Sequence, residues 1–228
     1  MTVKNYIKNK KQNSFNVKGV EIFIKDYPPS NVNAKLVIQS LFKKIPSKLL
    51  RNLDIIYIGQ FQHLVDRNIQ AMYENSSIFI TNEQLSDDDM LDDLVHEVAH
   101  SVEEIYNNMI YGDSKIENEF LLKRKKLWYY LKSEGYDCDL SDFLETKFTH
   151  KFDNFLYMEV GYPVLSAMTV NLFYSPYGST SIREYFANGF EAFYMQEDIS
   201  RLKKISPELY KKIIEINKVE EEKNEYFY

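Results

Sequence analysis

One segment constrains the fold more than any other: a predicted helix from Ser86 to about Met109 that is apolar along one side only. Ser86 is a good N-cap, and the three aspartates that follow it suit the positive end of the helix dipole. Apolar residues recur at spacings of three and four, which places them on one face. These residues are Leu91, Val95, Val98, Val102, Ile105 and Met109. Such a helix buries one side and leaves its polar side to face a cleft.

The polar side of this helix carries a short motif with metal-binding spacing, His96-Glu97-Val98-Ala99-His100. Residues four apart on a helix lie on the same face one turn apart, so both imidazoles can reach one ion. Zinc favours such nitrogen ligands, and catalytic zinc sites keep one position open for water. Glu97 lies between the histidines and is placed to accept a proton from that water. The alternative is a chance match, since so short a motif also recurs by accident.

A third protein ligand has to come from another segment of the chain. The long form of the motif has a third histidine six residues after His100, and it is excluded because that position is Tyr106. A carboxylate from a second helix is the other common solution. The predicted helix Ser181–Met195 offers Glu184 and Glu191, which are seven apart and share a face. Spacing alone leaves both open, because Glu184 could instead form a capping box and Glu191 could be a solvated acid.

A second motif surrounds Glu184. Tyr177 stands seven residues before it, and Glu184 opens the run Glu184-Tyr185-Phe186-Ala187-Asn188-Gly189-Phe190. Together with the histidine motif, this pattern resembles the catalytic domain of anthrax lethal factor and its relatives. It is also similar to the clostridial Pro-Pro endopeptidases. The resemblance covers about residues 35–215 and is specific at these two motifs.

The resemblance implies a zincin-like fold and a zinc peptidase site. It implies that His96, His100 and Glu184 bind one Zn²⁺ per chain and that Glu97 is the general base. It further implies that Tyr177 directs its hydroxyl at the tetrahedral intermediate.

The resemblance also carries one departure and one implication for substrate. Relatives often have an acid at the position of Asn188, so a contact from this residue to a ligand histidine is expected to be neutral here. Peptide is expected to bind as an added strand along a sheet edge. The candidate edge is Ile78-Phe79-Ile80, the last predicted strand before the histidine helix. The alternative is that these residues form an ordinary core strand.

The order of predicted elements indicates an α+β protein. Short strands at 20–24, 54–59 and 77–81 come first, and helices follow, which differs from the regular alternation of α/β folds. Together with this order, the resemblance implies a small mixed sheet over the histidine helix and a mostly helical C-terminal part. The expected division is a flexible arm at 1–18, one metallopeptidase domain at 19–219 and a frayed acidic tail at 220–228.

Composition narrows the possible partners. The 228 residues carry a net charge of −6, which argues against a nucleic-acid-binding protein. There is no stretch of eighteen apolar residues, so no membrane span is expected. No secretory signal is recognisable at the N-terminus, which fits a cytoplasmic, virion-associated or non-classically exported protein. The single cysteine, Cys138, excludes an internal disulfide, and its acidic neighbours disfavour a nucleophilic role.

These features predict a zinc-dependent endopeptidase that acts on a protein or peptide substrate. One alternative is a non-catalytic binding or toxin-delivery module that retains the fold. Another is a metal-dependent hydrolase with a different substrate.

Overall fold

The computed structural model describes residues 13–196 and 198–218. The chain divides into two compact units, one ending at Ile105 and the other beginning at Tyr106. The division falls inside helix α4 (Asp87–Tyr111), at Tyr106, whose backbone angles of φ −103° and ψ 16° are not helical.

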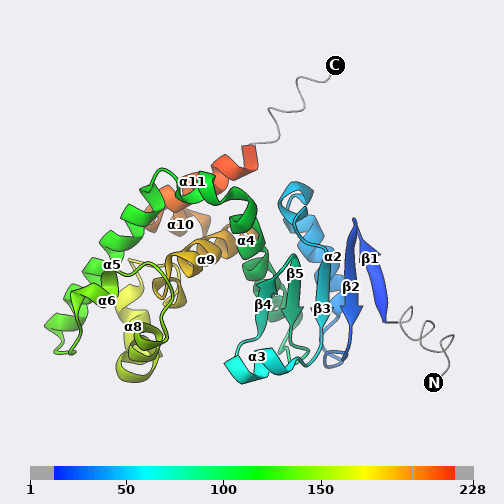
Figure 1. Cartoon of the computed structure of the whole chain (residues 1–228), viewed down its shortest axis with the longest axis horizontal. Coiled ribbons are helices and arrows are strands. Elements are labelled where there is room, and N and C mark those ends of the chain that lie inside the picture. Colours follow the sequence, from blue (N-terminus) through cyan, green and yellow to red (C-terminus); the bar gives the residue numbers. More distant parts are fainter. Residues whose placement is uncertain (1–12, 197, 219–228) are drawn as a thin grey trace, which may run out of the picture. The chain divides into compact units, whose positions relative to one another are not determined.

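The first unit is built on a five-stranded mixed sheet with strand order β1-β2-β3-β5-β4 (Figure 1). The strands are β1 (Ser14–Val17), β2 (Val20–Ile24), β3 (Ile55–Ile58), β4 (Ala71–Glu74) and β5 (Ser77–Ile80). The three central strands β2, β3 and β5 are parallel, and the edge strands β1 and β4 pair antiparallel to them.

Isoleucines on the central strands form one face of this sheet. Ile22, Ile56 and Ile78 stand in register on β2, β3 and β5 and are fully buried. On the opposite face the same strands carry half-buried aromatic rings, with Tyr57 stacked on Phe79 at 4.9 Å between ring centres. Because side chains alternate along a strand, one side of the sheet is core and the other is covered only in part.

The helices of the first unit follow from caps and apolar spacing. Helix α2 (Ala34–Lys44) begins after Asn33, whose side chain accepts a hydrogen bond from the backbone N–H of Leu36. Its buried face includes Val37, Ile38 and Leu41. Two short helices, η1 (Ser47–Leu50) and α3 (Gln62–Arg67), lie in the connections on either side of β3.

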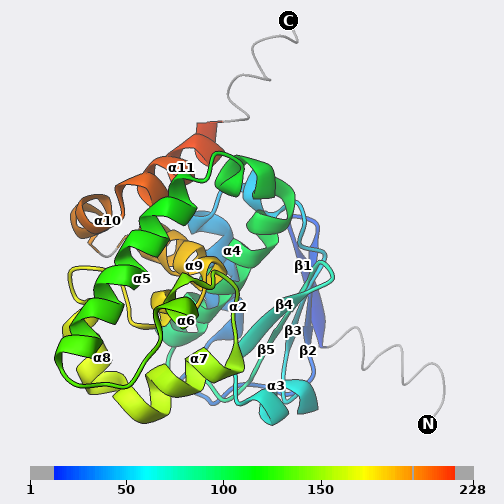
Figure 2. The same cartoon turned by 60° about the vertical axis from the view of Figure 1, so that its left-hand side comes forward.

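Among the described residues of the second unit, the regular elements are all helical (Figure 2). Beyond the end of α4, its elements are α5 (Lys115–Ser133), α6 (Leu140–Leu144), α7 (His150–Asn154), the π-helical segment η2 (Phe155–Val160), α8 (Tyr162–Thr169), η3 (Tyr177–Ser179), α9 (Ile182–Met195), α10 (Ile199–Ile205) and α11 (Pro207–Lys218). Its core contains the aromatic rings of Phe120, Phe173 and Tyr185, which contact one another.

The expected α+β class is confirmed as a mixed fold with a five-stranded sheet followed by helices. Four residues of the segment expected as an arm, Ser14–Val17, form β1 against β2. The rest of that segment, apart from residues 13 and 18, and the expected tail at 220–228 lie outside the described residues.

A buried lysine on α5 contacts α9 and the residue between α10 and α11 in the second unit. Lys123 on α5 is 7% exposed and donates to the hydroxyls of Tyr185 on α9 and Ser206, the latter at 2.7 Å. The Tyr185 hydroxyl donates to Glu119 at 2.7 Å, and Glu119 also accepts the backbone N–H of Glu208 at the start of α11. Burial lowers the pKa of Lys123 from 10.5 to about 7.

The lowered pKa of Lys123 predicts that stability increases with pH over the range from about 7 to 10.5. In this range the unfolded lysine holds a proton that the folded lysine has released, so raising the pH favours the folded state. We expect the free energy of unfolding to rise by about 2 kcal/mol between pH 7.5 and 9.5. This rise is the amount by which the pH-dependent change in the native protein exceeds that in Lys123→Met, with both free energies measured by urea unfolding. An equal pH dependence in the two proteins would contradict it.

Candidate metal centre

Helix α4 places the histidine motif on its polar side. Ser86 caps the helix by accepting the N–H of Asp89 at 3.1 Å, and Val95 and Val98 are fully buried on its apolar side. The rings of His96 and His100 lie edge to face with 5.2 Å between their centres. The helix therefore presents two imidazoles from consecutive turns at a separation that one metal ion can bridge.

The orientation of His100 is set by a carboxylate on the same helix. Its Nδ1 lies 2.7 Å from Oε2 of Glu103, which is only 3% exposed. A carboxylate accepts the Nδ1–H, so this contact selects the tautomer in which Nε2 carries the lone pair for a metal. Metal-binding histidines usually have such a partner, and the donor set of this helix therefore fits a zinc ion.

Glu97 is held by the sheet of the first unit. Its Oε2 accepts the backbone N–H of Tyr73 on β4 at 2.6 Å, and its side chain is 8% exposed. The Tyr73 hydroxyl in turn donates to Glu104 and accepts from Asn52 at 2.7 Å. Burial, followed by Glu104, raises the pKa of Tyr73 to about 12. These bonds fix both the edge strand and the carboxylate relative to the helix.

Glu184 begins α9 in the second unit. Ser181 is the N-cap of this helix, and its hydroxyl accepts the backbone N–H of Glu184 at 3.2 Å. The bond uses the backbone of Glu184, so it fixes the residue's place in the first turn without using its carboxylate. Glu191, the other candidate, lies two turns further along α9, and both side chains are half-buried.

Tyr177 lies in the short 3₁₀ turn η3 that precedes α9. The turn is closed by bonds from Ser179 N to Pro176 O and from Thr180 N to Tyr177 O, both at 3.0 Å. Tyr177 is 44% exposed. The second unit thus presents a phenol and a carboxylate on one short segment.

Asn188 supports the turn that carries Tyr177. Its side-chain oxygen accepts the N–H of Ser175 at 3.0 Å. A Cβ added at Gly178 would lie 3.0 Å from the same oxygen, so this glycine permits the close approach. Asn188 therefore supports a turn within the second unit. The side chain that contacts a histidine of the motif is the carboxylate of Glu103.

The expectation that residues 78–80 form the sheet edge is wrong. Strand β5, which contains Ile78, Phe79 and Ile80, lies between β3 and β4, and the edge strand is β4. Ile78 and Ile80 are fully buried and Phe79 is half-buried, as in an ordinary core strand. The sequence does not indicate the hairpin from β4 to β5, because its turn residues, Asn75 and Ser76, adopt left-handed conformations without the glycine that usually marks such positions.

Cys138 does not belong to a reactive site. The thiol is buried, and burial raises its pKa. A thiolate is the reactive form, so the environment suppresses nucleophilic character.

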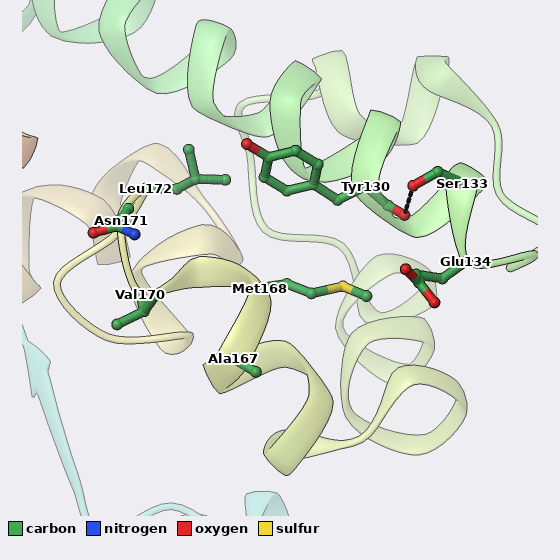
Figure 3. Close-up of a pocket in the computed structure, with 8 residues that line it drawn as sticks. All are labelled: Tyr130, Ser133, Glu134, Ala167, Met168, Val170, Asn171 and Leu172. Carbon is green, nitrogen blue, oxygen red and sulfur yellow. Dashed lines mark hydrogen bonds between the residues drawn. The ribbon is translucent and has the colours of Figure 1, made fainter.

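The second unit also contains a pocket of about 320 Å³ between the end of α5 and the end of α8 (Figure 3). Met168 and Leu172 form apolar parts of its wall, and Glu134 provides a carboxylate. None of the predicted site residues lines this pocket.

Comparisons with protein-family models, with curated proteins and with solved structures found no match to this chain. Membership of the lethal-factor family therefore stays a prediction from the two sequence motifs. In the part of the chain that the structure describes, no helix combines the length and apolar character needed to cross a bilayer.

The contact between His100 and Glu103 yields a prediction about metal affinity. Glu103→Gln keeps the size of the side chain but replaces the charged acceptor of the Nδ1–H with a neutral one. We expect zinc affinity to fall about 10- to 100-fold, because outer partners of metal-binding histidines have effects of this size. The measurement is competition with a chromophoric chelator. Glu104→Gln, a change in an exposed carboxylate on the same helix, is the control, and equal zinc affinity in both variants would refute the role of Glu103.

Proposed function

We propose that this protein is a zinc-dependent endopeptidase of the lethal-factor type. The observation that supports the proposal most strongly is the pair His96 and His100 on one face of α4, with Glu103 holding Nδ1 of His100. A metal-binding histidine is expected to have a buried carboxylate that holds its second ring nitrogen. A solvated surface motif has no need of a carboxylate that is 3% exposed.

Zinc would supply Lewis-acid activation of water and of the peptide carbonyl. In the proposed assignment, His96, His100 and Glu184 hold the ion. The choice of Glu184 over Glu191 rests on its spacing from Tyr177, which matches the resemblance, and on its place in the first turn of α9.

The chain's own groups would carry the proton transfers. Glu97 accepts a proton from the attacking water and delivers it to the leaving amine. The Tyr73 amide, which donates to Glu97, fixes the direction of that carboxylate. The Tyr177 hydroxyl donates a hydrogen bond to the developing oxyanion.

Edge strand β4 is the proposed docking strand for a peptide substrate. It replaces 78–80 in this role because it is the outer strand of the sheet and contacts Glu97 through Tyr73. An edge strand offers backbone donors and acceptors to an extended peptide, and these give affinity with little dependence on sequence. The N–H of Tyr73 is already used by Glu97, so the peptide would bind to the other outward backbone groups of β4.

The test measures zinc per chain and cleavage of a random peptide library by the purified protein and by Glu97→Gln. One equivalent of zinc with peptide cleavage by the native protein alone is the expected result. Zinc without cleavage would favour a non-catalytic module, and absence of zinc would refute the proposal.

A further inference from the structure

Arg124 on α5 is the largest of the fully buried side chains among the described residues. Its guanidinium lies 3.8 Å from the ring centre of Phe152, and the rings of Phe120 and Phe143 are also near. Removing a cation from water is costly unless its donors are satisfied. The arrangement of those donors therefore indicates what the buried charge does.

The two terminal nitrogens of Arg124 donate to backbone carbonyls, whereas its buried Nε has no hydrogen-bond partner among the described residues. Nη1 donates to Ser179 O at 2.7 Å and to Thr180 O at 3.2 Å, and Nη2 donates to Asp142 O at 2.6 Å. The planar fork of an arginine holds such acceptors in a fixed mutual geometry, which a lysine cannot reproduce. Arg124 thus ties the chain just before α9 to the helix α6.

The two carbonyls next to α9 belong to a segment that is held along its whole length. Asn188 accepts from Ser175 at its start, and Ile182 N donates to Thr146 O at 2.9 Å at its end. Arg124 supplies the bonds at Ser179 and Thr180, between these two supports. The residues from Tyr177 to Glu184 are therefore anchored in their middle by a side chain from α5.

We propose that Arg124 is the positioning residue that fixes the segment from Tyr177 to Glu184 and thereby sets the direction of the Tyr177 hydroxyl and the Glu184 carboxylate. The significance of these two groups rests on the proposed peptidase function. A buried cation contributes little net stability compared with an apolar side chain of similar size. Its specific contribution is the geometry that it imposes on the carbonyls it contacts.

The test uses two substitutions of Arg124 and one matched control. Arg124→Met keeps an apolar stem and removes every donor, whereas Arg124→Lys keeps the charge and loses the fork. Lys212→Met removes another buried cation of the second unit, one that contacts Asp113 at 2.9 Å and none of residues 175–184. Two quantities are measured: hydrogen exchange of residues 175–184 in the metal-free protein, and zinc affinity by chelator competition.

We expect Arg124→Met to speed exchange of residues 175–184 and to weaken zinc binding about tenfold, within the range seen for supporting residues of metal sites. Arg124→Lys shows intermediate changes in both. Lys212→Met leaves the exchange and the zinc affinity as in the native protein, even if it lowers thermal stability as much as Arg124→Met does. Native-like exchange and zinc affinity in either folded Arg124 variant would overturn the proposal, as would equal changes in Lys212→Met.

The two readouts separate this inference from the proposed function. If the native protein binds no zinc, the peptidase proposal fails. The exchange of residues 175–184 still decides whether Arg124 fixes the segment. If Arg124→Met does not fold, Arg124→Lys decides the question, because the inference concerns the fork and not the charge.

Discussion

We expect Glu97→Gln to cleave peptides about 10²- to 10⁴-fold more slowly than the native protein while it binds the same amount of zinc. Glutamine has the shape of glutamate but cannot take a proton from water at neutral pH. Its side-chain oxygen can still accept the N–H of Tyr73, the bond that Glu97 makes in the native protein at 2.6 Å. The fold and the two histidines should therefore be undisturbed.

The measurements are initial rates on a cleaved library peptide and zinc content by atomic absorption. Glu104→Gln is the control, since Glu104 lies on the same helix and contacts the same Tyr73 through its hydroxyl. It should keep most of the activity, because a glutamine oxygen can still accept the hydrogen bond of the Tyr73 hydroxyl. A Glu97→Gln protein that cleaves at the native rate would remove Glu97 from the mechanism.

The second large effect is expected from the proposed third ligand. Glu184→Ala should weaken zinc binding by more than about 100-fold, because even residues outside the ligand set can contribute 10- to 100-fold. The cap of α9 survives the change, since Ser181 bonds to the backbone N–H at this position. Zinc affinity by chelator competition is the readout, with thermal unfolding as a check on folding.

Glu191→Ala is the matched control for this experiment. It lies on the same helix, it is half-buried as Glu184 is, and the seven-residue spacing puts it on the same face. We expect its zinc affinity to be native-like. The reverse result, with zinc lost in Glu191→Ala and kept in Glu184→Ala, would assign the third ligand to Glu191.

Patterns that repeat along a helix were sufficient to predict the element that carries the histidines. The stripe from Leu91 to Val102 is buried as expected, and the cap at Ser86 is formed. The order of strands in the sheet could not be obtained in this way. Whether β5 or β4 occupies the edge depends on a hairpin whose outer strand has only four residues. Its two turn residues adopt left-handed conformations without glycine.

The residues of the candidate site could be predicted from the sequence only where they belong to a recognisable motif. Glu103 stands three residues after His100, a spacing that puts the two side chains in contact on a helix. This spacing is readable from the chain, but on an amphipathic helix it does not distinguish a buried partner of His100 from a solvent-facing acid. The contributions of Tyr73 and Arg124 could not be anticipated. They depend on a backbone amide of an edge strand and on carbonyls 55 and 56 residues away in the chain.

The bond from Tyr73 to Glu97 also affects how the protein behaves at high concentration. An edge strand with an outward N–H is a template on which a second copy of the chain can add a strand, and proteins often place a charge there to prevent it. In this protein the carboxylate of Glu97 covers that N–H. Glu97→Ala would uncover this N–H, so self-association would add to the effect of the lost carboxylate on activity. Glutamine keeps the amide covered, so it is the inactive form suited to crystallisation and to trapping peptides.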